Sequence, residues 1–183
     1  MRTFNDESIM EKNISRERMF DGIILNIDHV TNELPNGKLA KREIIVHVGA
    51  AAVLPIDSEG NVYLVRQFRA PLDKVLLEIP AGKLDHIGEN RLEAAKRELA
   101  EETGLEADNW LFLTDTYNAA GYSNECISLY LARDLKKGDS HPDEDEFLNL
   151  VKMPFDEAYE MVMRGEIRDA KTQITLLMAK NLI

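Results

Sequence analysis

Cysteine and long apolar runs are scarce in this sequence. Cys126 is the single cysteine, so no internal disulfide can form and a thiol-rich metal site is excluded. This usage fits a reducing compartment, and we expect a cytoplasmic location. The longest apolar run, residues 48–56, is interrupted by Gly49 and Pro55, and residues 1–12 contain no apolar stretch of the signal-peptide type. Neither export nor a membrane span is predicted.

Positive charge is also scarce. The 22 Lys and Arg residues face 33 Asp and Glu residues, which gives a formal net charge of -11. Such a chain repels a nucleic-acid backbone or an anionic membrane, so neither is expected as a direct partner. An anionic substrate would need a bridging cation. The histidines show no metal-ligand spacing and are interpreted as structural or exposed: His29, His47, His86 and His141.

The composition is otherwise that of a folded globular protein. Hydrophobic residues make up 44% and charged residues 30% of 183 residues. This length suits one domain with a real core, or a main domain with a small appendage. β-Branched runs at residues 20–30 and 42–48 flank Asn36-Gly37, which predicts a hairpin. Further strands are predicted at residues 50–55, 61–68, 74–79, 111–117, 126–132 and 147–151.

A helix is predicted over residues 91–103. Asn90 can cap its first turn, Glu93 stands where a capping box requires it, and Gly104 suits the left-handed position past the end. Two C-terminal helices are expected at residues 156–164 and 170–182, separated by Gly165. Strands around one central helix, with helices at the end, indicate an α/β or α+β sandwich.

Acidic residues gather on one side of the central helix. Glu98 and Glu102 are four residues apart, and Glu98 and Glu101 are three apart. Like charges at this spacing destabilise a helix, so the cluster marks either a solvated face or a cation site. Glu98 and Glu102 also border the apolar stripe of the helix, which places them near the core. The stripe consists of Leu92, Ala95 and Leu99.

Residues 97–105, Arg-Glu-Leu-Ala-Glu-Glu-Thr-Gly-Leu, together with Gly82 and Glu89, resemble the Nudix box of the Nudix hydrolase superfamily. One departure is visible, because the loop of residues 83–88 is one residue longer than the family pattern. An insertion in the loop should change the shape of the loop and leave the carboxylate spacing of the helix intact.

The resemblance implies a metal site for Mg²⁺, with Mn²⁺ as the alternative ion. A hard divalent cation prefers oxygen ligands and is held by carboxylates together with substrate phosphates. Bound metal would also explain how a chain of charge -11 accepts an anion. By the same resemblance, Arg97 and Glu89 brace the loop and the helix. The implied ligands are the carbonyl of Ala81 and the side chains of Glu98, Glu101 and Glu102.

Outside the box, other motifs resemble the ADP-ribose pyrophosphatase and nucleoside diphosphate sugar hydrolase branch. The resemblance implies Mg²⁺-dependent hydrolysis of the diphosphate linkage of ADP-ribose or a related nucleoside diphosphate sugar, giving a nucleoside monophosphate and a sugar phosphate. It extends from about residue 20 to the C-terminus. The motifs are Gln67-Phe68-Arg69, Glu78-Ile79-Pro80-Ala81-Gly82, Tyr117, Gly121-x-Ser123-x-Glu125 and Asp169-Ala170-Lys171-Thr172.

Three residues are substrate-binding candidates. Arg69 can grip a diphosphate because a guanidinium meets phosphate with two hydrogen bonds, although a surface ion pair is the alternative. Glu78 either contacts substrate or pairs with a basic strand neighbour. Gly121 belongs to a loop that usually reads Ser-Pro-Gly in the family, and here Ala119 and Ala120 replace the serine and proline. The change favours a related nucleoside diphosphate sugar, or a broader range, over ADP-ribose alone.

A general base must reach the attacking water. In this branch it lies on a loop before a late strand, which corresponds to the acidic residues 143–146. Glu146 is the first candidate and Glu144 the second. Without the resemblance, an acidic run of this kind is usually a solvated loop.

The resemblance also predicts the overall organisation. We expect a Nudix-type α/β/α sandwich with a mixed sheet in residues 49–183, and a small antiparallel β domain in residues 1–48 that pairs with a second subunit. A homodimer is therefore expected, with a plain edge hairpin in a monomer as the alternative. The rival functions are a non-catalytic Nudix sensor of ADP-ribose or another nucleotide, and a Mg²⁺-stabilised structural domain without turnover.

Overall fold

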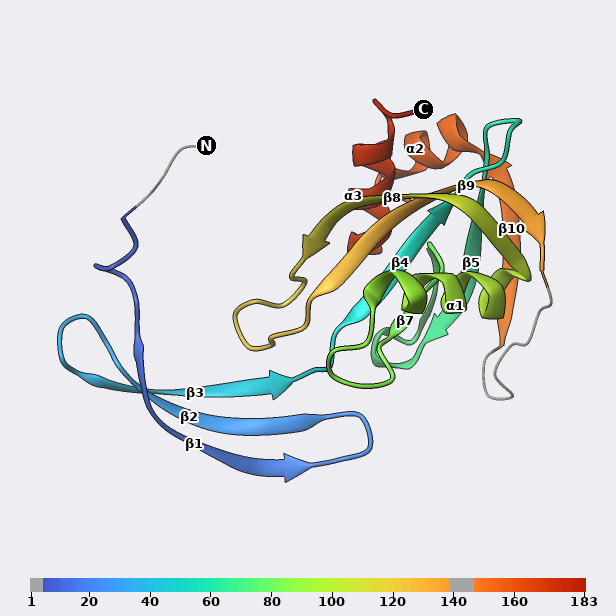
Figure 1. Ribbon diagram of the computed structural model, residues 1–183. Helices are drawn as coiled ribbons and strands as arrows, with labels where there is room; N and C mark the ends of the chain where they lie inside the picture. Colours follow the sequence, from blue (N-terminus) through green and yellow to red (C-terminus); the bar gives the residue numbers. More distant parts are fainter. Residues whose placement is uncertain (1–4, 139–146) are drawn as a thin grey trace. The chain divides into compact units, whose positions relative to one another are not determined.

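The computed structural model describes residues 5–138 and 147–183 (Figure 1). The chain divides into two compact units. Unit one comprises Met1–His47 and Ala119–Glu125, and unit two comprises Val48–Asn118 and Cys126–Ile183. In the described ranges, no helix has both the length and the apolar character needed to span a membrane.

Unit one is built on a three-stranded antiparallel sheet in the order β1-β2-β3. Its strands are β1 (Lys12–Asp21), β2 (Asn26–Glu33) and β3 (Leu39–Val46). The predicted hairpin is confirmed between β2 and β3, where Gly37 adopts a φ of 78° and its N–H donates to the Leu34 carbonyl at 2.8 Å. Residues 119–125 join this unit, because the Ile45 N–H donates to the Tyr122 carbonyl at 2.7 Å.

The strand expected over residues 20–30 is wrong as a single element. The structure breaks it at Gly22, whose N–H donates to the Leu25 carbonyl at 2.9 Å and closes a turn between β1 and β2. A Cβ at position 22 would overlap the ring of Phe20 and would lie 3.0 Å from the Leu25 carbonyl oxygen, so the turn favours glycine. Strand β1 therefore precedes the predicted hairpin and extends it to three strands.

Unit one has little core of its own. Every residue of β1 is exposed. Two residues of β2, Asp28 and Val30, are buried. The Asp28 carboxylate accepts hydrogen bonds from Nε of Arg16 and Nε of Arg18, each at 2.5 Å. These two guanidinium groups lower the pKa of Asp28.

Unit two contains two sheets. An antiparallel sheet has the order β10-β5-β6, and a mixed sheet has the order β7-β4-β9-β8, in which β4 and β9 run parallel. A short 3-10 helix, η1 (Ala70–Leu72), separates β5 from β6. The strands are β4 (Ala50–Pro55), β5 (Asn61–Arg69), β6 (Lys74–Glu78), β7 (Ala81–Lys83), β8 (Leu105–Thr116), β9 (Ile127–Lys137) and β10 (Leu148–Pro154).

Three helices complete unit two: α1 (Arg91–Thr103), α2 (Phe155–Met163) and α3 (Ala170–Ala179). The helix predicted over residues 91–103 is confirmed at both ends. The last helix ends at Ala179, three residues before the predicted end, and is capped by a hydrogen bond from the Lys180 N–H to the Leu176 carbonyl at 3.2 Å.

Strand β4 separates two apolar cores. Its even-numbered residues Ala50, Ala52 and Leu54 belong to a core that also contains buried residues of α2, α3 and the antiparallel sheet. Its odd-numbered residues Ala51 and Val53 pack with buried residues of α1. Because successive strand residues face opposite sides, the mixed sheet is covered on both faces. The predicted α/β (α+β) fold class, with a mixed sheet and a separate antiparallel β unit, is confirmed.

Candidate functional site

Helix α1 carries the acidic residues of the candidate site. Residues next to each end of this helix determine where it begins and ends. The Asn90 side chain accepts hydrogen bonds from the N–H groups of Leu92 at 2.9 Å and Glu93 at 3.3 Å. Gly104 adopts the left-handed conformation, with a φ of 67°. Glu93 accepts a hydrogen bond from Lys96 at 2.8 Å, so its side chain serves an ion pair along the helix.

Two of the three box carboxylates are buried. Glu98 is 7% exposed and Glu102 is 9% exposed, whereas Glu101 is only partly buried. Both buried carboxylates pack on β7. The Ala81 N–H donates to Oε2 of Glu102 at 3.1 Å, and any side chain at Gly82 would overlap the Glu98 carboxylate. Strand β7 and helix α1 therefore place Glu98 and Glu102 together, as the sequence spacing predicted.

Arg97 links two of these carboxylates. Its NH1 donates to Oε1 of Glu98 at 2.7 Å and to Oε2 of Glu101 at 3.1 Å. Burial lowers the pKa of Arg97, but the negative charges of Glu98, Glu101 and Asp85 outweigh burial and raise it. The guanidinium is therefore held in its charged form against the acidic face of α1.

Arg97 also reaches the loop before α1. Its NH2 donates to the Lys83 carbonyl at 3.3 Å and lies 3.8 Å from Oε1 of Glu89. The other Glu89 oxygen, Oε2, accepts a hydrogen bond from the Asp85 N–H at 2.6 Å. These contacts agree with a bracing role for Arg97 and Glu89. The longer loop is thus tied to the helix at several points.

The donor chemistry of this cluster suits a hard divalent cation. Three carboxylates lie on one side of α1, two of them are buried, and the Ala81 main chain lies beside Glu102. Oxygen donors of this kind are the ligands that Mg²⁺ and Mn²⁺ prefer. Within residues 5–138 and 147–183, no three His, Cys, Asp or Glu side chains already converge as a ligand set. In this structure Glu98 and Glu101 share Arg97 instead.

Arg69 lies at the end of β5 and pairs with Glu78 at the end of β6. Its Nε and NH2 donate to the two oxygens of Glu78, each at 2.7 Å. These hydrogen bonds raise the pKa of Arg69 against the opposing effect of burial, and the charges of Asp169 and Glu102 add to the rise. Arg69 therefore lies within electrostatic reach of the acidic face of α1. Of the two alternatives for Glu78, pairing with a basic strand neighbour is the contact observed.

Sequence reasoning assigned no role to Lys171, although the Asp-Ala-Lys-Thr motif that contains it was a visible signal. Lys171 lies in the first turn of α3, and its Nζ hydrogen-bonds to Oε2 of Glu78 and to Oδ1 of Asp169, the latter at 3.0 Å. Asp169 also accepts from the Thr172 N–H at 2.9 Å and thereby caps the helix. The start of α3 is thus joined to the Arg69–Glu78 pair.

The other predicted residues lie in unit one or outside the described residues. Gly121 is exposed and belongs to the segment 119–125 of unit one, and a side chain built there would meet no atom within 4 Å. The two candidate bases, Glu146 and Glu144, lie outside the described residues. Their role stays a prediction.

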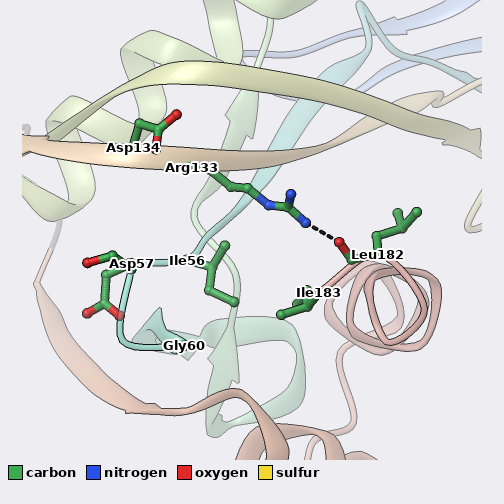
Figure 2. Close-up of a pocket in the computed structure, with 8 residues that line it drawn as sticks. Ile56, Asp57, Gly60, Arg133, Asp134, Leu182 and Ile183 are labelled. Carbon is green, nitrogen blue, oxygen red and sulfur yellow. Dashed lines mark hydrogen bonds between the residues drawn. The ribbon is translucent and has the colours of Figure 1, made fainter.

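A surface hollow of about 300 Å³ lies elsewhere in unit two and contains none of the predicted site residues (Figure 2). Ile56, Asp57 and the C-terminal Ile183 line it, among others. Two of its charged groups are engaged within the chain, because Arg133 donates to the Leu182 carbonyl and Asp57 pairs with Lys152 at 2.7 Å. The hollow contains no residue of the box.

The family model of the NUDIX domain matches residues 46–175, most of the chain and all of the cluster described above. The chain belongs to the NUDIX domain family. The resemblance seen in the sequence is confirmed. Nudix hydrolases generally use divalent metals, which agrees with the oxygen donors on α1.

Several known proteins match at substantial identity. An ADP-ribose pyrophosphatase of Bacillus subtilis (strain 168) is 40% identical over 168 residues, which cover 91% of this chain and 90% of that protein. A methanol dehydrogenase activator of Bacillus methanolicus is 41% identical over 168 residues, with the same coverage of 91% and 90%. A GDP-mannose pyrophosphatase of Yersinia enterocolitica is 36% identical over 141 residues, covering 72% of this chain and 73% of that protein.

A solved structure confirms the Nudix fold. The crystal structure of an ADP compounds hydrolase superimposes with a TM-score of 0.81 and covers 94% of this chain and 93% of that chain. Because the sequence identity is 23%, this similarity shows a shared fold and nothing about function.

Proposed function

We propose that this Nudix protein hydrolyses the diphosphate linkage of a nucleoside diphosphate sugar, ADP-ribose or a related compound, with the help of a divalent cation. The observation that carries the proposal is the packing of buried Glu98 and Glu102 against β7, three residues after Glu78, the partner of Arg69. A cation-binding carboxylate pair and an anion-binding guanidinium thus lie on neighbouring segments of the chain, as a metal-bridged diphosphate requires.

The names of the relatives support the substrate class. Two of them are named for cleavage of ADP-ribose and of GDP-mannose, which share a diphosphate between a nucleoside and a sugar. The diphosphate is thus the part of the substrate that we assign to this site. Ala119 and Ala120 replace the usual serine and proline, and on that ground we propose a range wider than ADP-ribose alone.

For the metal we propose the four predicted oxygen donors, with Mg²⁺ as the ion and Mn²⁺ as its substitute. When bound, such an ion neutralises diphosphate charge and lowers the pKa of an attacking water. Arg97 holds Glu98 and Glu101 in place and Gly82 leaves room for the Glu98 carboxylate. The donors are the Ala81 carbonyl and the side chains of Glu98, Glu101 and Glu102.

The remaining roles fall to substrate-binding and proton-accepting groups. Arg69 binds a phosphoryl oxygen, and Gly121 belongs to the loop that contacts the sugar or base. The oxygen of water forms a bond to one phosphorus while the bond from that phosphorus to the bridging oxygen breaks. The products are a nucleoside monophosphate and a sugar phosphate. The proton of the water passes to Glu146, our first choice of base, or to Glu144.

We also propose a homodimer that forms through residues 1–48, with residues 49–183 as the Nudix hydrolase domain. In the three strands of unit one, Asp28 and Val30 are the residues with less than a tenth of their surface exposed. Every residue of β1 is exposed. A sheet with an exposed apolar face gains stability when a further layer covers that face. A second copy of the same sheet is the layer that we assign.

The decisive test is Glu102→Gln, which keeps the size of the side chain and removes its charge. We expect release of AMP from ADP-ribose with Mg²⁺ to fall by more than about 100-fold, because even outer partners of a metal ion contribute about 10–100-fold. Glu106→Gln, an exposed position on β8, is the matched control and should keep full activity. Full activity in Glu102→Gln would refute the metal assignment.

A panel of nucleoside diphosphate sugars and dinucleotides, assayed with Mg²⁺ and with Mn²⁺, ranks the substrates in the same experiment. Turnover of at least one nucleoside diphosphate sugar by the wild-type protein is the expected result. Tight binding of ADP-ribose without turnover of any panel member would instead identify a non-catalytic sensor.

A further inference from the structure

Glu78 is the most buried charged group beside the proposed site. It is 1% exposed, and its two oxygens accept hydrogen bonds from two different cations. Arg69 engages both oxygens, each at 2.7 Å, and Lys171 engages Oε2. Because the carboxylate is buried and both of its oxygens already accept hydrogen bonds, a substrate in solution has no access to it.

Lys171 is itself buried, with 8% of its side chain exposed, and it is fixed at a second point. Its Nζ also donates to Oδ1 of Asp169, and Oδ2 of Asp169 accepts from the Thr172 hydroxyl at 2.6 Å. The Thr172 Oγ1 in turn accepts a hydrogen bond from the Ile79 N–H at 2.8 Å. The first turn of α3 is thus locked to the end of β6 by side chains and main chain together.

Arg69 is the only open member of this network among the described residues. Its side chain is 38% exposed. Within the described ranges, its guanidinium donates hydrogen bonds to Glu78 alone, through Nε and NH2, so the NH1 group is left for an external acceptor. Because Glu78 holds the Nε and NH2 side of the guanidinium, the NH1 group meets an external acceptor in a single orientation.

We infer that Glu78 and Lys171 are positioning residues, which hold the Arg69 guanidinium in the orientation that grips the diphosphate of the substrate. Lys171 orients Glu78, and Glu78 orients Arg69. The inference rests on the proposed function for the identity of the bound anion. It gives the Asp-Ala-Lys-Thr motif a specific task, which is to support from α3 an anion-binding group of β5.

The test separates positioning from folding by measuring binding as well as turnover. In Lys171→Met the stem of the side chain remains and the charge is lost. We expect KM for the best nucleoside diphosphate sugar to rise about tenfold, which corresponds to about 1.4 kcal/mol, while kcat changes by less than about threefold. The affinity for ADP, measured by calorimetry in EDTA so that no turnover occurs, should fall by a similar factor. A purely structural role would lower the folded fraction without changing KM or the affinity of the folded protein.

The double variant Arg69→Ala, Lys171→Met provides the coupling test. If Lys171 acts through Arg69, its substitution should change ADP affinity by less than about twofold once Arg69 is gone, because residues that share one network are not additive. Lys180→Met is the matched control, since Lys180 lies at the end of the same helix and pairs with the exposed Asp156. That variant should bind ADP as the wild type does.

Asp169→Asn is the second probe, and it decides the question if Lys171→Met fails to fold. Asparagine keeps the capping oxygen and removes the charge that fixes Lys171, so KM and the ADP dissociation constant should both rise, by less than in Lys171→Met. Unchanged KM and unchanged ADP affinity in the folded variants would overturn the inference. An equal effect of Lys171→Met with and without Arg69 would overturn it as well.

The same measurements keep this inference apart from the proposed hydrolysis. A wild-type protein that binds ADP but cleaves no member of the panel would refute the hydrolysis, and a loss of ADP affinity in Lys171→Met would still support the positioning role. A wild-type protein that neither binds ADP nor turns over substrate would refute both.

Discussion

At the scale of single residues, Gly82 leaves the space that the Glu98 carboxylate occupies in the proposed metal site. The Glu98 carboxylate lies directly over Gly82, where no side chain fits. Gly82 has no positive φ, so its backbone could accept other residues and space alone excludes them. The glycine at the start of the box is thus explained by the packing of the Glu98 carboxylate, a proposed metal ligand, against β7.

We predict that Gly82→Ala weakens metal binding without unfolding the protein. The added methyl group displaces the Glu98 carboxylate, and outer partners that orient a ligand contribute about 10–100-fold to metal affinity. Titration calorimetry with Mn²⁺ should show a loss of this size. Gly138→Ala is the control, because its methyl group meets the exposed, flexible side chain of Glu106. Equal Mn²⁺ affinities for Gly82→Ala and wild type would contradict the packing argument.

The ionisation of Glu78 makes part of the stability dependent on pH. Burial raises the pKa of Glu78, but the hydrogen bonds and charges of Arg69 and Lys171 outweigh burial, so the pKa falls below its ordinary value of 4.5. A group whose pKa is lower in the folded state stabilises fully above its unfolded pKa. This contribution is therefore present at neutral pH and is lost as the pH falls below about 4.5.

We predict that Glu78→Gln lowers the melting temperature at pH 7, and that its deficit relative to the wild type shrinks as the pH falls from about 5 to about 3. Breaking a buried ion pair costs about 3 kcal/mol, which for a chain of this size is a fall of roughly 6–12 °C. Thermal unfolding followed by circular dichroism measures the deficit. A deficit that stays constant with pH would show that the carboxylate charge does not stabilise the fold.

At the scale of elements, helix α1 depends on its cap. Asn90 satisfies two N–H groups of the first turn, and α1 presents all three box carboxylates. We predict that Asn90→Ala destabilises the protein by about 1 kcal/mol, or roughly 2–4 °C in melting temperature. Asn90→Asp, which keeps a capping oxygen, should retain the wild-type melting temperature. If both variants melt alike, the cap contributes nothing measurable.

The same helix shows why part of this site could be predicted from sequence. Its cap, its C-terminal glycine and its apolar stripe are local signals, and all of them act within residues 90–104. The spacing of Glu98 and Glu102 on one face follows from helical geometry alone. Local physics was sufficient here because the functional groups and the element that carries them are the same stretch of chain.

Other features could not be predicted from the sequence, because they depend on contacts that exist only in the folded chain. Lys171 and Glu78 are 93 residues apart in sequence, and nothing local to either predicts that they share a hydrogen bond. Strand β7 is three residues long and has no strand pattern of its own, and it exists because Ala81 and Gly82 pair with Ala52 and Ala51 of β4. The break at Gly22 was missed because a lone glycine within a β-branched run is a weak turn signal, whereas in the fold the Gly22 N–H closes a turn with the Leu25 carbonyl.

At the scale of the whole molecule, unit one carries an apolar row that crosses all three of its strands. Phe20 pairs in register with Ile27, and Ile27 pairs with Ile45, so the three side chains share one face of the sheet. Phe20 is 54% exposed, and the two isoleucines are half-buried. If the proposed homodimer forms through this sheet, burial of this apolar row would stabilise the dimer.

We predict that Phe20→Glu converts the dimer into a monomer at micromolar concentration. Burial of a phenylalanine side chain contributes about 1.5–3 kcal/mol, and in a symmetric dimer the substitution occurs twice, so the dissociation constant should rise by at least about 100-fold. Sedimentation equilibrium of the wild type and the variant measures this change.

Met163→Glu introduces the same charge at an exposed position at the end of α2 and should leave the association unchanged. A wild-type protein that sediments as a monomer would refute the proposed dimer, and a Phe20→Glu variant that still dimerises with wild-type affinity would place the interface away from this row. Because unit one buries so little of its own surface, the first of these outcomes would also require unit one to be stabilised by something other than a second copy of the chain.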